Sequence, residues 1–134
     1  GKEMTQHALW QLFRSRYGLV ADPHFALQSY RSDSKQDGQL RLTASVVTQG
    51  ATRQLEGQGN GLLSAAASGL SRWLNTPFVI KDYHEHTLGE RSDSRSVAYI
   101  RCLFQDGSSR WGVGIDSDVA RASLQALFNA VSCL

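Results

Sequence analysis

The chain has few cysteines, little excess charge of either sign and no long hydrophobic run. Cys102 and Cys133 are too few for a disulfide framework and too isolated for a zinc site, so we expect two reduced thiols. A formal charge of +2 gives no electrostatic reason to expect nucleic acid as a partner. No apolar segment approaches the roughly 20 residues of a membrane-spanning helix, and no basic-then-apolar leader is present. We therefore expect a soluble, cytoplasmic protein without a membrane partner.

The length and composition predict one folded domain. The chain has 134 residues, of which 41% are hydrophobic and 19% charged. A chain of this length buries roughly two-thirds of its unfolded surface, which excludes disorder.

The first 22 residues have the pattern of a helix followed by a linker. Apolar residues recur at spacings of three and four from Glu3 to Tyr17, which is typical of one helical stripe. Asp22-Pro23 ends this helix. Because the chain opens with Gly1 rather than methionine, we interpret residues 1–22 as a stub of a connection to a larger protein.

Residues 25–75 read as three strands and a helix. Gln39 to Thr48 alternates apolar and polar residues, as a half-buried strand does. Phe25 to Tyr30 precedes it, and a Gln49-Gly50 turn leads to a third strand at Thr52 to Glu56. Helical spacing then starts at Leu62 and stops at Asn75-Thr76-Pro77.

Residues 78–133 repeat this order. Three strands are predicted at Phe78 to Leu88, Ser96 to Phe104 and Ser109 to Ile115, and a helix from about Ser117 to Val131. Gly57-x-Gly59 and Gly112-x-Gly114 occupy matching places before the two helices. The sequence thus predicts an α+β domain over residues 23–134. It consists of duplicated βββα units, with antiparallel sheets and the helices packed on one side.

The junction from Gly57 to Gly61 is the first candidate site. Glycines permit a tight turn and close backbone approach, and the free amides at a helix start suit a carboxylate or a phosphate. The junction lacks the βαβ context of a dinucleotide site and the Gly-Lys-Ser/Thr ending of a phosphate-binding loop. The alternative is a turn that needs glycine only for its geometry.

The segment from Asp82 to His86 is the second candidate. Alternation places Asp82, His84 and His86 on one strand face, a spacing that can bind a metal. Structural hydrogen bonding at a sheet edge or subunit interface is the alternative. No Gly-x-Ser-x-Gly elbow and no paired carboxylates are present, so we expect no catalytic residues.

These motifs together resemble a known regulatory domain. Gly57 to Leu63, Asp82 to His86, and Trp111 to Ile115 followed by Ala122-Ser123 are similar to the C-terminal regulatory domain of 2-isopropylmalate synthase. The resemblance runs from about Phe25 to the end of the chain. Regulatory domains of citramalate synthase, which respond to isoleucine, share the pattern.

The resemblance implies a regulatory role for this chain. The family's enzymes are acyltransferases that condense acetyl-CoA with 3-methyl-2-oxobutanoate in a (β/α)8 barrel that uses a divalent metal. This chain has no such barrel, so we expect neither catalysis nor a cofactor in it. The family's regulatory domain is a homodimer that binds L-leucine near the interface and inhibits the distant catalytic domain. A ligand-free dimerisation module is the remaining alternative.

The resemblance also implies an effector site. The carboxylate of the amino acid would meet the glycine-rich junction and first helical turn, and its side chain would meet apolar walls. Asp82 would pair with or orient toward the ammonium group. The residues assigned to the carboxylate are Gly59, Asn60, Gly61, Leu63 and Ser64, and those assigned to the walls are Ile80, Tyr83 and Ile115.

Two features complicate this site. Strict alternation puts Ile80 and Tyr83 on opposite faces, so either a bulge intervenes or one of them lies outside the pocket. The family usually has Gly-x-Asp-Ala-x-Ala where this chain has residues 91–96, with serines in place of both alanines. We keep Ser94 and Ser96 as pocket residues, in a pocket of similar volume and higher polarity.

Overall fold

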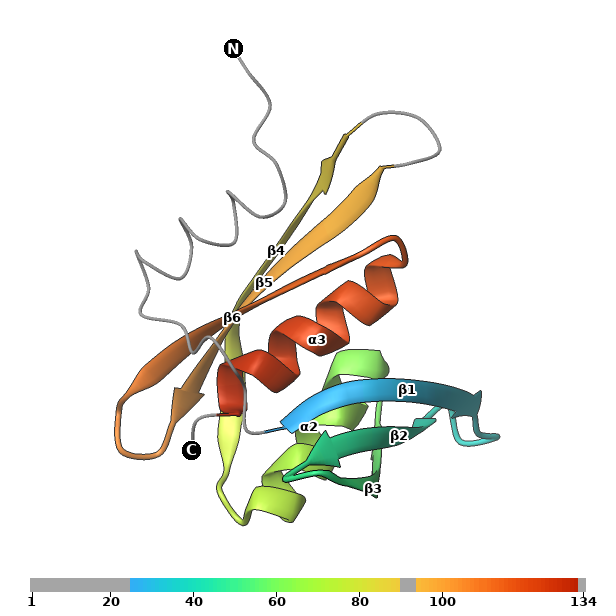
Figure 1. Ribbon diagram of the computed structural model, residues 1–134. Helices are drawn as coiled ribbons and strands as arrows, with labels where there is room; N and C mark the ends of the chain where they lie inside the picture. Colours follow the sequence, from blue (N-terminus) through green and yellow to red (C-terminus); the bar gives the residue numbers. More distant parts are fainter. Residues whose placement is uncertain (1–24, 90–93, 133–134) are drawn as a thin grey trace.

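The computed structural model describes residues 25–89 and 94–132, which form two βββα units in succession (Figure 1). The sequence prediction of duplicated units with antiparallel sheets is confirmed. The elements of the first unit are β1 (Phe25–Ser34), β2 (Leu40–Thr48), β3 (Ala51–Gly59) and α2 (Leu62–Leu74). Those of the second are β4 (Phe78–Leu88), β5 (Arg95–Phe104), β6 (Ser109–Asp116) and α3 (Val119–Val131).

Each unit folds as a three-stranded antiparallel meander, with strand order β1-β2-β3 in sheet A and β4-β5-β6 in sheet B. The two outer strands of sheet A are longer than the sequence predicts, because β1 continues to Ser34 and β3 to Gly59. Bulges interrupt the first strand of each sheet, between Leu27 and Ser29 in β1 and between Ile80 and Asp82 in β4.

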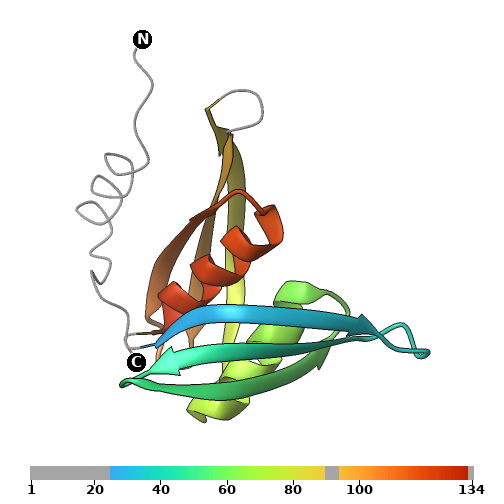
Figure 2. The ribbon, with the colours of Figure 1, turned by 45° about the vertical axis from the view of Figure 1, so that its right-hand side comes forward.

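The helices fill the space between the two sheets. α2 packs on β2 and β3, whereas α3 packs on β5 and β6 and also contacts β1 and α2. Figure 2 shows α3 lying along sheet B with sheet A crossing below it. The inward faces of both sheets and helices form one apolar core, whose largest fully buried side chains include Leu42, Leu70, Ile100, Leu124 and Phe128. This shared core makes the two units one body.

The matched Gly-x-Gly motifs allow each helix to lie directly on its neighbouring strand. A Cβ atom at Gly57 would stand 2.0 Å from the carbonyl oxygen of Ala65, and one at Gly112 would stand 2.0 Å from that of Ala126. No side chain fits at such a distance, so a glycine is required at these points of close approach. The glycines of the first motif therefore have a packing role.

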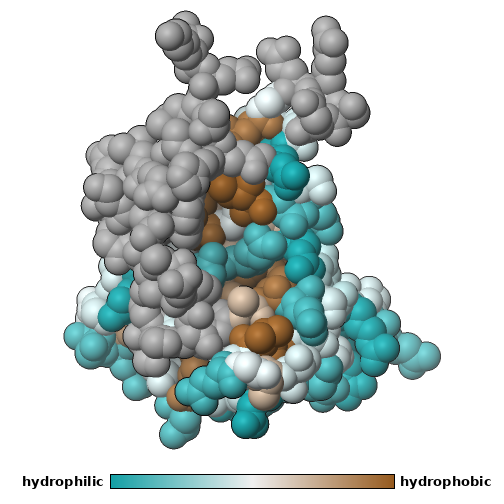
Figure 3. All heavy atoms as spheres, viewed as in Figure 1, coloured by the Kyte–Doolittle hydropathy of each residue, from teal (hydrophilic) through white to brown (hydrophobic). Residues whose placement is uncertain are grey.

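The opposite face of sheet B carries a second, smaller cluster of Val97, Tyr99 and Val113, with Leu88, Trp111 and Ile115 around it. Figure 3 shows hydrophobic residues along the middle of one face of the molecule, and the upper group lies in the region of the strands of sheet B. Apolar side chains therefore occur on both faces of sheet B, whereas the outer face of sheet A carries Ser29, Arg31, Thr43, Ser45 and Gln54.

Cys102 lies in the main core as a free thiol, and its burial raises its pKa to about 12. Cys133 and the predicted helix from Glu3 to Tyr17 lie outside the described residues. Within the described ranges, no helix has the length and apolar character needed to cross a bilayer.

Candidate functional site at the helix N-termini

The first turns of both helices meet β4 around an open depression of about 420 Å³. This volume is in the range of small-molecule sites. The lining is mainly apolar, with a few polar groups contributed by three elements. These residues are Gly61, Leu62, Leu63 and Ser64 at the start of α2, Tyr83 and Glu85 on β4, and Val119, Ala120 and Ser123 on α3.

The start of α2 is open toward this depression. Gly61 has extended backbone and no side chain with which to cap the helix. Ser64 Oγ accepts a hydrogen bond from the Gly61 amide at 2.9 Å. The amides of Leu62 and Leu63 have no intrahelical acceptor, because they lie in the first turn, and no other acceptor for them occurs among the described residues. A Cβ at Gly61 would meet nothing within 4 Å. Free amides at the positive end of a helix, in open space, suit an anionic group.

The start of α3, by contrast, is satisfied by its own residues. Asp118 Oδ1 accepts a hydrogen bond from the Ala120 amide at 3.0 Å, as an N-cap residue does. Asp116 Oδ1 in turn accepts one from the Asp118 amide at 3.0 Å. A carboxylate therefore already occupies the position that an anion would take at this helix.

A hydroxyl and a carboxylate of β4 form the polar part of the depression. The Tyr83 hydroxyl donates to Glu85 Oε2 at 2.7 Å and shares a hydrogen bond of 2.7 Å with Ser123 Oγ. Ser123 Oγ also lies 2.9 Å from the Val119 carbonyl, so its one hydroxyl hydrogen is shared between Tyr83 and that carbonyl. Burial raises the pKa of Tyr83, and the Glu85 contact adds to this rise while the Ser123 bond opposes it.

Glu85 has no cationic partner among the described residues, whose ion pairs join Arg101 to Asp82 and Arg121 to Asp116. The depression therefore contains a positive helix end and a carboxylate that no cation in residues 25–89 and 94–132 neutralises. An α-amino acid carries the complementary pair of charges, a carboxylate and an ammonium group.

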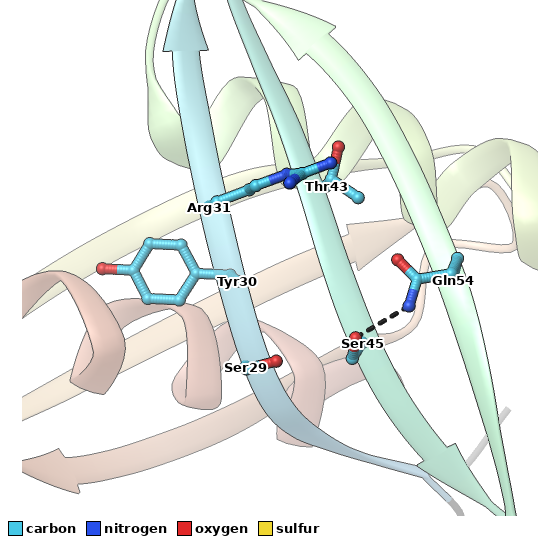
Figure 4. Close-up of a pocket in the computed structure, with 6 residues that line it drawn as sticks. All are labelled: Ser29, Tyr30, Arg31, Thr43, Ser45 and Gln54. Carbon is cyan, nitrogen blue, oxygen red and sulfur yellow. Dashed lines mark hydrogen bonds between the residues drawn. The ribbon is translucent and has the colours of Figure 1, made fainter.

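A second depression, of about 320 Å³, lies on the outer face of sheet A. Figure 4 shows that Ser29, Arg31, Thr43, Ser45 and Gln54 line it from three neighbouring strands, whereas the ring of Tyr30 points to one side. Gln54 Nε2 donates to Ser45 Oγ at 2.8 Å, so two of its polar groups already satisfy one another. It has neither a helix end nor a surrounding apolar wall, and we favour the depression at the helix N-termini as the functional site.

Comparison with known proteins identifies the family to which this arrangement belongs. The family described as "LeuA allosteric (dimerisation) domain" matches residues 3–134. The chain belongs to this family. The resemblance found in the sequence motifs is thereby confirmed.

Relatives of this LeuA domain are named 2-isopropylmalate synthase. The protein from Marinomonas sp. is 41% identical over 132 residues, covering 97% of this chain and 24% of the relative. The protein from Rhodospirillum rubrum is 36% identical, and the alignment covers 100% of this chain and 24% of the relative. The protein from Thermobifida fusca is 34% identical, and the alignment covers 98% of this chain and 22% of the relative. The chain thus spans about a quarter of the length of these relatives.

The bulge in β4 explains how two predicted pocket residues of this LeuA domain come to share a face. Ile80 pairs with Cys102 and Tyr83 pairs with Ile100, and both partners belong to the main core. The extra residue, Lys81, restores the two side chains to the same side of the sheet. Of the two, Tyr83 reaches the depression, whereas Ile80 packs against the core and is not part of its lining.

The structure does not bring Asp82 into the depression. The same bulge turns this residue to the opposite face of sheet B, where its carboxylate forms an ion pair with Arg101. His84 stacks on Trp111 on that face, with ring centroids 6.5 Å apart, and His86 lies 3.3 Å from the Tyr99 hydroxyl. In the ranges that the structure covers, no group of three metal-ligating side chains is close enough to hold an ion.

The other predicted site residues fall into two groups. Gly61, Leu63 and Ser64 line the depression with Tyr83. Five do not line it. Gly59 packs beneath Ser64, and Asn60 Oδ1 accepts a hydrogen bond from Gln39 Nε2 at 3.4 Å. Ser94 lies just before β5, and Ser96 lies on the same side of β5 as Ala98, which faces the helices. Ile115 pairs with Val97 and belongs to the outer cluster of sheet B. Their roles in effector binding stay predictions.

Five lining residues are absent from the sequence-based set: Leu62, Glu85, Val119, Ala120 and Ser123. Leu62, Glu85 and Ser123 lie within the motifs that carry the family resemblance, so a signal for them exists in the sequence. Val119 and Ala120 have no such signal, because only the packing of α3 beside α2 brings them to the site.

Proposed function

We propose that the chain is the allosteric domain of a 2-isopropylmalate synthase and binds L-leucine as a feedback inhibitor in the depression at the helix N-termini. The observation that carries this proposal is the start of α2, where no N-cap side chain accepts from the helix amides, in the same depression as Glu85, a carboxylate with no cationic partner among the described residues. The leucine carboxylate would meet the amides of Leu62 and Leu63, and its ammonium group would meet Glu85. Leu63 and Val119 would contact the isobutyl group.

The energies of these contacts favour a site completed by a second copy of the chain. Burying a leucine side chain contributes ~1.5–3 kcal/mol, and a carboxylate at a helix start about 0.3–1 kcal/mol, or up to ~2 where partly buried. Micromolar affinity requires about −8 kcal/mol. The ammonium group must therefore also be paired and water largely excluded. Since the depression is open in one chain, we propose that a homodimer interface closes it.

The catalytic steps belong to the rest of the parent enzyme in this proposal. The (β/α)8 barrel with its divalent metal would perform the acyl transfer, and this domain would regulate it. Inhibition then requires that leucine bind one conformation of the whole enzyme better than another, because equal affinity would shift nothing.

A thermal-shift panel with L-leucine, L-isoleucine and D-leucine tests the proposal. Ligand at 100 times its Kd stabilises the folded state by about 2.7 kcal/mol, so we expect L-leucine to raise the melting temperature by several degrees. D-leucine is the control, because its ammonium group and side chain exchange places relative to the helix start. A rise with isoleucine alone would favour the citramalate synthase alternative. A rise with none of the three would leave only a dimerisation module.

A further inference from the structure

Arg121 connects the depression to the first strand of the chain. It lies in the first turn of α3, directly after Ala120 of the depression lining. Its Nη2 donates to the Gln28 carbonyl at 2.7 Å and lies 3.5 Å from the Leu27 carbonyl. Its Nε lies 3.4 Å from Asp116 Oδ2 at the end of β6. One guanidinium therefore holds together three elements from both units.

The bulge in β1 makes this contact possible. The register with β2 shifts between Leu27 and Ser29, so Gln28 has no paired residue in the ladder. A bulged residue leaves the regular hydrogen-bond pattern, which exposes backbone groups to other partners. β1 is also an edge strand of sheet A, and the planar guanidinium can reach its carbonyls from the side of α3.

A second contact joins the same two elements. The Tyr30 hydroxyl donates to Asp118 Oδ2 at 3.3 Å, while the other oxygen of Asp118 caps α3. The first turn of α3 is thus tied to β1 through Arg121 on one side and through the N-cap carboxylate on the other. Val119, Ala120 and Ser123 of the depression lie on that turn or directly after it.

We propose that Arg121 is a positioning residue that couples occupancy of the depression to β1. The inference rests on the proposed function, because it takes leucine as the ligand. Leucine bound against Val119 and Ser123 reduces the motion of the first turn of α3. Because Arg121 on this turn donates a hydrogen bond to the Gln28 carbonyl, the motion of β1 at Gln28 is reduced as well. Coupling of this kind is reciprocal, so release of the Gln28 contact also weakens leucine binding.

Amide hydrogen exchange of the 134-residue chain, with and without L-leucine, tests this coupling. In the unchanged chain, we expect leucine to slow exchange at the start of α2 and, by about fivefold or more, at residues 26–30 of β1. In Arg121→Gln, with leucine at a concentration that saturates this variant, the protection at α2 stays and the protection at β1 is lost. Arg121→Lys keeps the positive charge but lacks the planar guanidinium, so it recovers only part of the leucine-dependent protection at β1. Arg53→Gln, an exposed arginine of β3, is the matched control and behaves as the unchanged chain.

The ratio of exchange rates with and without leucine separates coupling from simple loss of structure. A purely structural Arg121 would speed exchange at β1 equally in both conditions and leave the ratio unchanged, which would overturn the inference. Calorimetric titration of the same samples reports binding itself. If leucine binds Arg121→Gln and protects β1 as strongly as in the unchanged chain, the coupling alone is overturned. If leucine does not bind the unchanged chain, both the proposed function and the coupling are overturned.

Discussion

Glu85 differs from the other acidic residue of its strand in what surrounds it. Asp82 is neutralised by Arg101 on the outer face of sheet B, whereas Glu85 receives only the Tyr83 hydroxyl among the described residues and lines the depression. A carboxylate without a cationic partner beside an apolar wall selects ligands that carry a cation.

Replacing Glu85 with glutamine removes this charge with little change in shape. In Glu85→Gln we expect the affinity for L-leucine to fall by about 10-fold or more, because a hydrogen bond between charged groups becomes one to a neutral amide. Binding of 4-methyl-2-oxopentanoate, which has the same skeleton without the ammonium group, should not weaken. Titration calorimetry measures both ligands, and Glu56→Gln on β3 is the control. An equal loss for both ligands would contradict the assigned role of Glu85.

The pairing of a strand with the helix that follows it depends on the two Gly-x-Gly motifs. In each unit the helix backbone occupies the space where a Cβ would stand on the last strand of the sheet. Close approach of this kind brings the buried alanines of each helix onto the sheet, such as Ala65 and Ala126. These small residues face the strand, so packing there is dense and does not accommodate an added methyl group.

Gly112→Ala tests this packing. The added methyl group would overlap the Ala126 carbonyl, which is backbone and cannot rotate away, so α3 must shift. We expect the free energy of unfolding to fall by about 1–3 kcal/mol, as overpacked cores show, measured by urea denaturation. Gly61→Ser is the matched control, since it adds a side chain in open space at an N-cap position that serine favours. A similar loss in both variants would show that close approach is not the cause.

At the scale of the whole molecule, the duplicated halves are similar in fold and unequal in chemistry. The first turns of α2 and α3 border the same depression. Of the two, only α2 presents amides without a side-chain acceptor, because Asp118 caps α3. Duplication by itself would suggest two equivalent anion sites in each chain. The structure supports a single one.

We therefore expect one L-leucine per chain. Titration calorimetry gives the stoichiometry, and light scattering of the same sample gives the number of chains in the assembly, so that a site shared between two chains is recognised. A half-site value would mean that two copies close around one ligand. Two leucines per chain would contradict the assignment of the α3 start as occupied by its own carboxylate.

Much of this fold is readable from local patterns. Alternation in Gln39 to Thr48 predicts β2, helical spacing from Leu62 predicts α2, and the repeated Gly-x-Gly reveals the duplication. The open helix start at Gly61 is readable in the same way, because glycine cannot cap a helix with a side chain. Each of these features depends only on residues close together in the sequence and on whether one face of a helix or strand is buried or exposed to water.

The composition of the site was decided by tertiary structure. One extra residue at the β4 bulge turns Tyr83 and Glu85 toward the helices and Asp82 away, and the register of β5 with β6 puts Ile115 on the far face. The contact of α3 with β1 and α2 brings Val119 and Arg121 to their places. Alternation is a local rule that one inserted residue reverses, and the separation of distant residues is set by packing of the whole core. The sequence alone therefore determined the elements and the open helix end, whereas only the folded chain determined which side chains surround it.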